Sequence, residues 1–226
     1  TKLAFEDAIE LVRQFKLLGD TTDKIPAVLD AYEEVRRVDV ARIQNAARNS
    51  TEWFENVDRY TGMEIEQFAY SLLTRSQRIS HENLRLRDRA WLQGYETWLA
   101  RAAGVAATQP PVPPMLLPLQ VRGTRLKNRI VVSPMATYSA VDGVVQDFHL
   151  VHLGARALGG AALVMVEMTR PNPHGRITPG CPGLWNDTQA AALAPIAASI
   201  KAAGAVPGIQ IGHAGRKASA NRPWEG

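Results

Sequence analysis

The sequence contains a single cysteine, Cys181, and no apolar run long enough to span a membrane. One cysteine cannot form an intramolecular disulfide, so a reducing, cytoplasmic setting is expected. A transmembrane helix needs about 20 consecutive, mostly apolar residues. The chain opens in a charged amphipathic pattern rather than a signal peptide, and it has no repeat of fixed period and no low-complexity tract. We therefore expect a globular protein without a membrane partner.

Aromatic residues are also sparse, at 7%, and the charge is unevenly distributed. Residues 105–226 hold 11 Lys and Arg against 5 Asp and Glu, whereas residues 1–104 hold 15 against 17. A basic region can bind nucleic acid. Here the basic residues are scattered and are not interleaved with aromatic residues. An anionic cofactor or small-molecule substrate fits the charge as well, and we expect no nucleic-acid partner.

A proline-rich segment divides the sequence into two parts. Residues 1–103 carry apolar side chains every three to four positions, which predicts helices. The expected helices cover residues 1–18, 25–48, 63–74 and 83–102. Thr21 or Thr22 can cap the second helix, and Ser50 can cap a short turn. Residues 104–114 include four prolines in five positions, which favours an extended linker between two domains.

After the linker, short β-branched runs alternate with amphipathic helices. The expected elements are a hairpin at 115–126 with its turn at Arg122-Gly123, strands at 129–132, 161–167 and 206–211, and helices at 147–158 and 188–203. This order is typical of a parallel sheet with right-handed crossovers. Closure of a (β/α)8 TIM barrel takes eight units and about 250 residues. The expected fold class is α/β, with an all-helical part at 1–103 and an incomplete TIM barrel, its first three β/α units, at 115–226.

Each of the three expected strands runs into small or polar residues. The segments are Ser133-Pro134-Met135-Ala136, Glu167-Met168-Thr169 and Gln210-Ile211-Gly212-His213. The carboxyl ends of parallel strands lie at one edge of their sheet, and α/β folds bind their ligands there. We therefore predict that these segments line one pocket.

Other reactive residue types favour structural roles. His149 and His152 lie three positions apart on an expected helix, but we find no carboxylate or cysteine partner within reach. His213 follows a strand and is expected to support its loop. Cys181 stands beside Pro-Gly pairs without a nearby base and is expected to be inert. The sequence predicts no metal site.

A series of short motifs follows in order over residues 115–217. They are Leu126-Lys-Asn-Arg-Ile130, Ser133-Pro-Met135, Tyr138, Phe148-His149, Val166-Glu167, Pro173-His-Gly-Arg176, Leu184-Trp185, Gln210 and His213-Ala-Gly-Arg-Lys217. Together they resemble the flavin reductases of the Old Yellow Enzyme family. The resemblance implies a (β/α)8 barrel that holds FMN at the carboxyl ends of its strands and uses NAD(P)H.

The same resemblance implies roles for individual residues. The residues expected to line the flavin ring are Ser133, Pro134, Met135 and Ala136. Met168 stands where a small residue near a flavin carbonyl is common, and Gln210 would hydrogen-bond the pyrimidine side of the ring. Tyr138 would orient a substrate carbonyl as the catalytic residue, with a packed loop aromatic as the alternative. Ala136 departs from close relatives, which often have a cysteine there that tunes the flavin potential.

The helical part has a resemblance of its own. The segments Thr1-Lys-Leu-Ala-Phe-Glu-Asp-Ala8 and Tyr32-Glu-Glu-Val-Arg-Arg37 look like the end of an FAD-dependent aromatic monooxygenase. This implies backbone contacts from Lys2 and Leu3 to FAD at a helix N-terminus, with an ordinary amphipathic helix as the alternative. The combined order resembles the bifunctional salicylyl-CoA 5-hydroxylase and 2-aminobenzoyl-CoA monooxygenase/reductase group of aromatic degradation.

That group implies hydroxylation of an aryl-CoA thioester with FAD, NAD(P)H and O2, and reduction of an activated ring or enone at an FMN barrel. We expect residues 1–226 alone to be inactive and not to bind FMN stably, because the remaining site elements would lie outside them. One alternative is a non-redox (β/α) barrel enzyme on the same scaffold. Another is a helical interaction or scaffold module, in which residues 1–103 form a partner or homo-oligomer surface.

Overall fold

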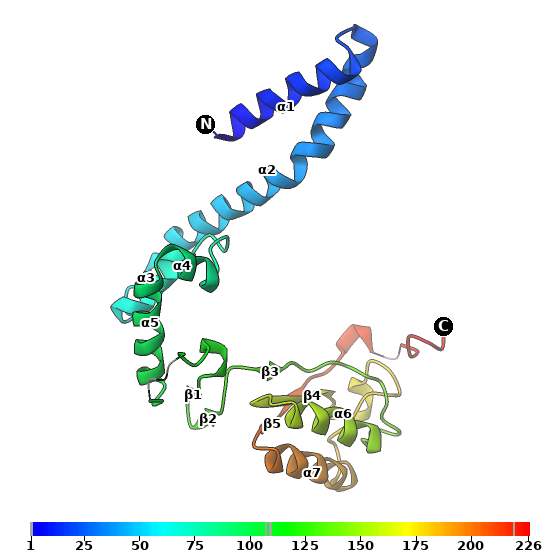
Figure 1. Cartoon of the computed structure of the whole chain (residues 1–226). Helices are drawn as coiled ribbons and strands as arrows, with labels where there is room; N and C mark the ends of the chain where they lie inside the picture. Colours follow the sequence, from blue (N-terminus) through cyan, green and yellow to red (C-terminus); the bar gives the residue numbers. More distant parts are fainter. Residues whose placement is uncertain (1, 107, 109, 219) are drawn as a thin grey trace. The chain divides into compact units, whose positions relative to one another are not determined.

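The structure is a computed structural model that describes residues 2–106, 108, 110–218 and 220–226 (Figure 1). The chain divides into two compact units, Thr1–Tyr95 and Glu96–Gly226. Helices and small sheets are both present, which confirms the α/β class. Within the described ranges, no helix combines the length and apolar character that a membrane crossing requires.

The first unit is helical, as predicted. Its elements are α1 (Lys2–Leu18), α2 (Ile25–Glu55), α3 (Ile65–Thr74), α4 (His81–Arg87) and the beginning of α5 (Arg89–Ala102), with 3₁₀ turns at Thr22–Lys24 and Val57–Arg59. Gly19 ends α1 with a φ of 104°, a conformation that glycine adopts readily. Arg36 links α2 to α1, because its Nε donates to Asp7 Oδ1 at 2.8 Å and its Nη2 lies 3.2 Å from Glu6 Oε2.

The start and end of α2 differ from the sequence prediction. Thr21 precedes a 3₁₀ turn without a side-chain cap, and Lys24 precedes α2, so the predicted threonine cap is wrong. The helix continues to Glu55, which places Ser50 inside it rather than at a cap. Ser50 Oγ instead accepts a hydrogen bond from Arg75 Nε at 2.8 Å. The hydroxyl therefore bonds to a residue 25 positions away, a pairing that local sequence patterns do not reveal.

The helix predicted at 83–102 is divided into α4 and α5. Asp88 separates them with extended backbone angles, φ −149° and ψ 89°. Its Oδ1 accepts the backbone N–H of Trp91 at 3.0 Å, so the side chain satisfies a donor of the new helix. Ser80 and Asn83 form a capping box at the start of α4. Local side-chain hydrogen bonds thus override the continuous apolar pattern.

The second unit contains two small sheets. The first is an antiparallel hairpin of β1 (Leu119–Val121) and β2 (Thr124–Leu126), with Arg122 at a φ of 50° in the turn. The turn is as predicted, although Pro114–Leu116 forms a 3₁₀ turn instead of a strand. The second sheet has the order β3 (Val131–Val132), β4 (Leu163–Thr169) and β5 (Val206–Ile211), all parallel.

Two helices connect the parallel strands and build the core with them. They are α6 (Asp147–Leu158) and α7 (Asp187–Ala202). Val164 and Val166 of β4 share one buried cluster with Leu153 of α6 and with Ile196 and Ile200 of α7. Full burial of each such side chain contributes about 1.5–3 kcal/mol. The predicted parallel β/α arrangement is confirmed for these units, whereas the incomplete barrel stays a prediction.

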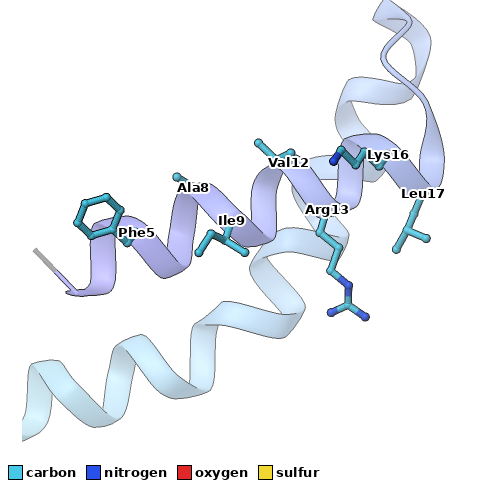
Figure 2. A pocket seen from close by; sticks show the side chains of 7 residues that line it. All are labelled: Phe5, Ala8, Ile9, Val12, Arg13, Lys16 and Leu17. Carbon is cyan, nitrogen blue, oxygen red and sulfur yellow. The ribbon is translucent and has the colours of Figure 1, made fainter.

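An exposed apolar face runs along α1 (Figure 2). It forms a shallow groove lined by Phe5, Ala8, Ile9, Val12, Arg13, Lys16 and Leu17. Phe5, Ile9 and Leu17 are each about two-thirds exposed, at 66%, 67% and 66%. The buried residues of α1 are polar, Glu10 and Gln14, whereas several large apolar side chains of this helix are exposed.

Candidate functional site

The three parallel strands end at the same edge of their sheet. β3 ends at Val132, so the loop after it begins with Ser133, and β5 ends at Ile211. The pairing of β4 with β5 shifts register between Val166 and Thr169. The parallel order places these strand ends at one edge of the sheet, whereas the prediction that their segments line one pocket stays a prediction.

The residues predicted to contact FMN differ in their exposure. Ser133, Met135, Ala136 and Gln210 are exposed, whereas Pro134 and Met168 are half-buried. The Met168 sulfur packs over Gly212, where an added Cβ would lie only 2.5 Å from Sδ. Met168 is thus fixed against the strand end of β5, while the loop after β3 and the Gln210 amide are open to a ligand. Their contact with flavin stays a prediction.

Tyr138 adopts a backbone conformation that is unusual for an aromatic residue. Its φ is 53°, in the left-handed region, and its side chain is half-buried. Gly180 packs against its backbone, since a Cβ there would lie 2.1 Å from the Tyr138 carbonyl oxygen. The Tyr138 ring also lies 6.5 Å from the Trp224 ring, centroid to centroid, in a tilted arrangement. Neighbouring residues therefore fix Tyr138 from more than one side.

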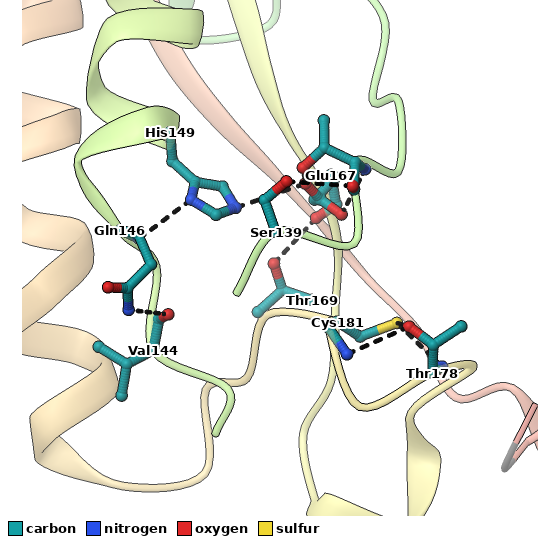
Figure 3. A network of polar contacts seen from close by, with 10 residues as sticks. Ser139, Val144, Gln146, His149, Glu167, Thr169, Thr178 and Cys181 are labelled. Atoms are coloured by element: carbon teal, nitrogen blue, oxygen red, sulfur yellow. Dashed lines mark hydrogen bonds and ion pairs between the residues drawn. The ribbon is translucent and has the colours of Figure 1, made fainter. Parts of the chain in front are cut away.

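Glu167 forms a buried polar link between β4 and the loop after β3 (Figure 3). Its side chain is 4% exposed. Glu167 Oε2 accepts the backbone N–H of Thr137 at 2.9 Å, and Oε1 accepts the Thr137 hydroxyl at 2.5 Å. In the sequence, Glu167 belongs to a motif at a strand end to which no role was assigned. A carboxylate ending an apolar strand was the available signal, because a buried charge needs partners.

His149 approaches the same carboxylate from α6. The ring is 2% exposed, and its Nδ1 accepts the backbone N–H of Gln146 at 3.0 Å, so the ring proton lies on Nε2. Nε2 lies 3.6 Å from Glu167 Oε1. The prediction that no carboxylate is within reach of His149 was therefore wrong. The two residues are on different elements that the fold brings together, which their spacing in sequence does not reveal.

These contacts keep Glu167 ionised. Burial raises the pKa of Glu167, but the His149 ring and the two Thr137 donors outweigh burial and hold this pKa below its ordinary value. Burial, together with the nearby Arg156 charge, lowers the pKa of His152. Over the described parts of the chain, no group of three His, Cys, Asp or Glu side chains could hold a metal ion.

The other sequence candidates have structural contacts. Cys181 is 1% exposed, and its Sγ accepts the Thr178 N–H at 3.5 Å and lies 3.9 Å from Arg170 Nη2. His213 Nδ1 accepts the Gly215 N–H at 3.0 Å, so it supports its own loop as expected. In the first unit, Lys2 and Leu3 form the first turn of α1, where Lys2 is exposed and Leu3 is half-buried. Contact of these two residues with FAD stays a prediction.

Comparison with known proteins addresses the second unit. Residues 114–224 match the NADH:flavin oxidoreductase / NADH oxidase family. We refer to them as the flavin oxidoreductase segment. An NADH:flavin oxidoreductase of Gibberella zeae is 45% identical over 107 residues, which are 47% of this chain and 26% of that protein. An NADPH dehydrogenase of Bacillus licheniformis is 45% identical over 106 residues, 46% of this chain and 31% of that protein.

The chain thus spans between a quarter and a third of the length of these curated relatives. Among solved structures, a morphinone reductase in complex with tetrahydroNAD is 29% identical, with a TM-score of 0.44 over 47% of this chain and 29% of that one. A 2-naphthoyl-CoA reductase in complex with 2-naphthoyl-CoA is 26% identical, with a TM-score of 0.45 over 46% and 16%. Structural likeness at this level adds no argument. The sequence matches relate the segment to flavin-dependent NADH and NADPH oxidoreductases.

Proposed function

We propose that the flavin oxidoreductase segment supplies part of an FMN site in an NAD(P)H-dependent oxidoreductase that reduces an activated C=C bond. The observation that carries the proposal is that a segment matching this family ends its parallel strands at one edge with Ser133, Met168 and Gln210. A binding site at the carboxyl edge of a parallel sheet is the common arrangement in α/β enzymes.

The groups available at this edge suit a flavin ring. The loop of Ser133 to Ala136, exposed except for the half-buried Pro134, offers backbone donors and acceptors, and the exposed Gln210 offers a side-chain amide that both donates and accepts. Gln210 would orient the pyrimidine side of the ring and stabilise the negative charge that reduction places there. Met168, packed over Gly212, would supply an apolar contact.

Tyr138 would act on the substrate rather than on the cofactor. Its hydroxyl would donate a hydrogen bond to the carbonyl oxygen of an α,β-unsaturated substrate and polarise the conjugated double bond. FMN, when bound, supplies hydride transfer between NAD(P)H and the β-carbon of such a substrate. Overall, NAD(P)H and one proton reduce the C=C bond to a saturated C–C bond, and NAD(P)⁺ is released.

The finer features implied by the resemblance of the helical part stay predictions. The family match begins at residue 114, so it does not reach the helices of residues 2–103. FAD and an aryl-CoA substrate therefore rest on the sequence resemblance alone, and a homo-oligomeric assembly rests on the alternative of a helical interaction module. A non-redox barrel enzyme is less well supported, because the matched relatives are named as NADH or NADPH oxidoreductases.

The test uses the product of the complete open reading frame that contains this sequence. We expect the purified protein to release FMN on denaturation and to be bleached by NADH or NADPH without oxygen. Addition of 2-cyclohexenone should restore the yellow colour. Release of FAD besides FMN would support the monooxygenase part, whereas a colourless protein, or a flavin that neither nucleotide bleaches, would refute the proposal.

A matched pair of glutamine variants makes the test specific. Gln210→Ala should weaken FMN binding, because it removes the amide at the proposed pyrimidine side. Gln120→Ala is the control, since the exposed side chain of this β1 glutamine donates to the Arg122 carbonyl of its own turn. Equal FMN affinity in both variants would remove Gln210 from the proposed site.

A further inference from the structure

The loop between β3 and α6 is tied to the sheet at one residue, Thr137. Both donors of Thr137, its backbone N–H and its hydroxyl, bond to the two oxygens of the Glu167 carboxylate. Charged acceptors make the stronger class of hydrogen bond, and burial strengthens them further. Ser139 adds a local bond from its Oγ to the Thr137 carbonyl oxygen at 3.1 Å. The carboxylate therefore fixes the backbone of the loop and not only a side chain.

His149 lies beside the carboxylate on the opposite element. Its Nδ1 accepts the backbone N–H at the start of α6, and its Nε2 lies 3.6 Å from Glu167 Oε1, at ion-pair rather than hydrogen-bond distance. The ring cannot turn away without losing the capping bond. A small cavity beside these groups is lined by Ser133, Met135, His149, Glu167 and their neighbours. The link thus lies directly beneath the segment proposed to meet the flavin.

Tyr138 follows Thr137 immediately and has the left-handed φ of 53°. Such a conformation persists in a bulky residue only where its surroundings hold it. Thr137 and its bonds to Glu167 hold the residue before Tyr138. Gly180 meets the carbonyl group of Tyr138 itself, and the Gly180 carbonyl accepts the Ala140 N–H at 3.0 Å. The backbone of Tyr138 is therefore held from both flanks.

We propose that Glu167 is a positioning residue, which acts through Thr137 to hold Tyr138 in the conformation that presents its hydroxyl to substrate. The proposal rests on the proposed function for the role of Tyr138 in catalysis. The mechanical link from Glu167 to Tyr138 is independent of flavin and of activity, so it is measured separately.

The first experiment measures that link in the 226-residue chain. The chain contains five tyrosines, so incorporation of ¹³C-tyrosine gives few NMR signals, and Tyr138→Phe identifies the signal of Tyr138. Thr137→Val keeps the shape and the backbone N–H but removes the hydroxyl, and Glu167→Gln removes the charge. We expect both variants to shift or broaden the Tyr138 signal. Thr137→Ser, which retains both donors, should leave it unchanged.

Thr169→Val is the matched control for the loss of a buried hydroxyl. Thr169 is 0% exposed, and its Oγ1 donates to the Glu167 backbone carbonyl at 2.9 Å without touching the carboxylate. The Tyr138 signal of the Thr169→Val variant should match that of the wild type. An unshifted Tyr138 signal in both Thr137→Val and Glu167→Gln would overturn the proposal. Should Glu167→Gln fail to fold, Thr137→Val decides the question alone.

The second experiment measures catalysis in the complete protein loaded with FMN. Glu167→Gln should lower kcat for enone reduction by about 10- to 100-fold, the range that a small misplacement of a catalytic group produces. In a Tyr138→Phe background the same change should have almost no further effect, because both act through one hydroxyl. If the double variant instead lost kcat by the product of the two single losses, the route through Tyr138 would be overturned. A shifted Tyr138 signal in a protein without NAD(P)H:flavin activity would retain the link and refute the proposed function.

Discussion

Gly180→Ala is the sharpest structural prediction for the loop that carries Tyr138. A Cβ at Gly180 would lie 2.1 Å from the Tyr138 carbonyl oxygen, 2.6 Å from its carbon and 2.8 Å from Arg222 Nε. Ordinary contacts of a Cβ begin near 3.4 Å. The backbone of one loop must therefore move, because two of the three close atoms belong to the main chain and cannot rotate away.

The size of the effect follows from two opposing terms. Overpacking of this kind lowers the free energy of unfolding by about 1–3 kcal/mol. The substitution also restricts the unfolded chain, which offsets about 0.4–1 kcal/mol of that loss. We expect a net loss of about 1–2 kcal/mol, which lowers Tm by roughly 4–8 °C in a unit of this size. Thermal unfolding followed by circular dichroism measures the shift, and the ¹³C signal of Tyr138 should move with it.

Gly123→Ala supplies the control for this prediction. Gly123 lies in the β1–β2 turn, and a Cβ there meets nothing within 4 Å. Its Tm should stay the same or rise slightly, since only the unfolded-state term remains. A Gly180→Ala protein with a wild-type Tm and an unmoved Tyr138 signal would refute the close approach of the two loops.

Three further changes probe other parts of the chain. The folded pKa of Glu167 lies below its ordinary value of 4.5, so its stabilisation is present above pH 4.5 and is lost as pH falls through the folded pKa. The Tm advantage of the wild type over Glu167→Gln should therefore shrink from about pH 6 to about pH 3, and a constant difference would contradict the ionised state. Ser80→Ala removes the capping box of α4 and should cost about 1 kcal/mol in denaturant unfolding, which Ser80→Thr should largely restore. Ile200→Ala, at 0% exposure in α7, should cost about 2–5 kcal/mol. Val151→Ala, at 70% exposure on α6, should change stability by less than about 0.5 kcal/mol, and similar losses for the two would contradict the core assignment.

The sequence predicted elements well where a single period dominates. The predicted ranges for α6 and β5 agree with the structure, because Gly159 directly follows α6 and Gly204 ends the turn before β5. The register of the parallel sheet then explains why the strand ends meet at one edge. Predictions failed where a side chain found a partner outside the pattern, as Ser50 does with Arg75. The division of the chain at the proline-rich linker stays a prediction.

The candidate site was predicted only in part for the same reason. Residues at strand ends were predicted because topology alone gathers them at one edge of the sheet. The bonds from Thr137 to Glu167 span 30 positions, and the contact of His149 with Glu167 joins a helix to a strand. A sequence gives the residue types of such a link but not the pairing, since any of several hydroxyl groups could meet a given carboxylate. Thr137 was missed because an isolated threonine in a loop carries no pattern.

The register shift in β4 makes the length of this strand as important as its residues. Side chains alternate between the faces of a strand, so a slip of one residue exchanges the two faces. The irregularity between Val166 and Thr169 interrupts this alternation, and both Val166 and Glu167 are buried as consecutive residues. Deletion of a single residue here would bring Met168 to the position that receives the Thr137 donors. In this strand, substitutions should therefore be tolerated far more readily than the insertion or deletion of a residue.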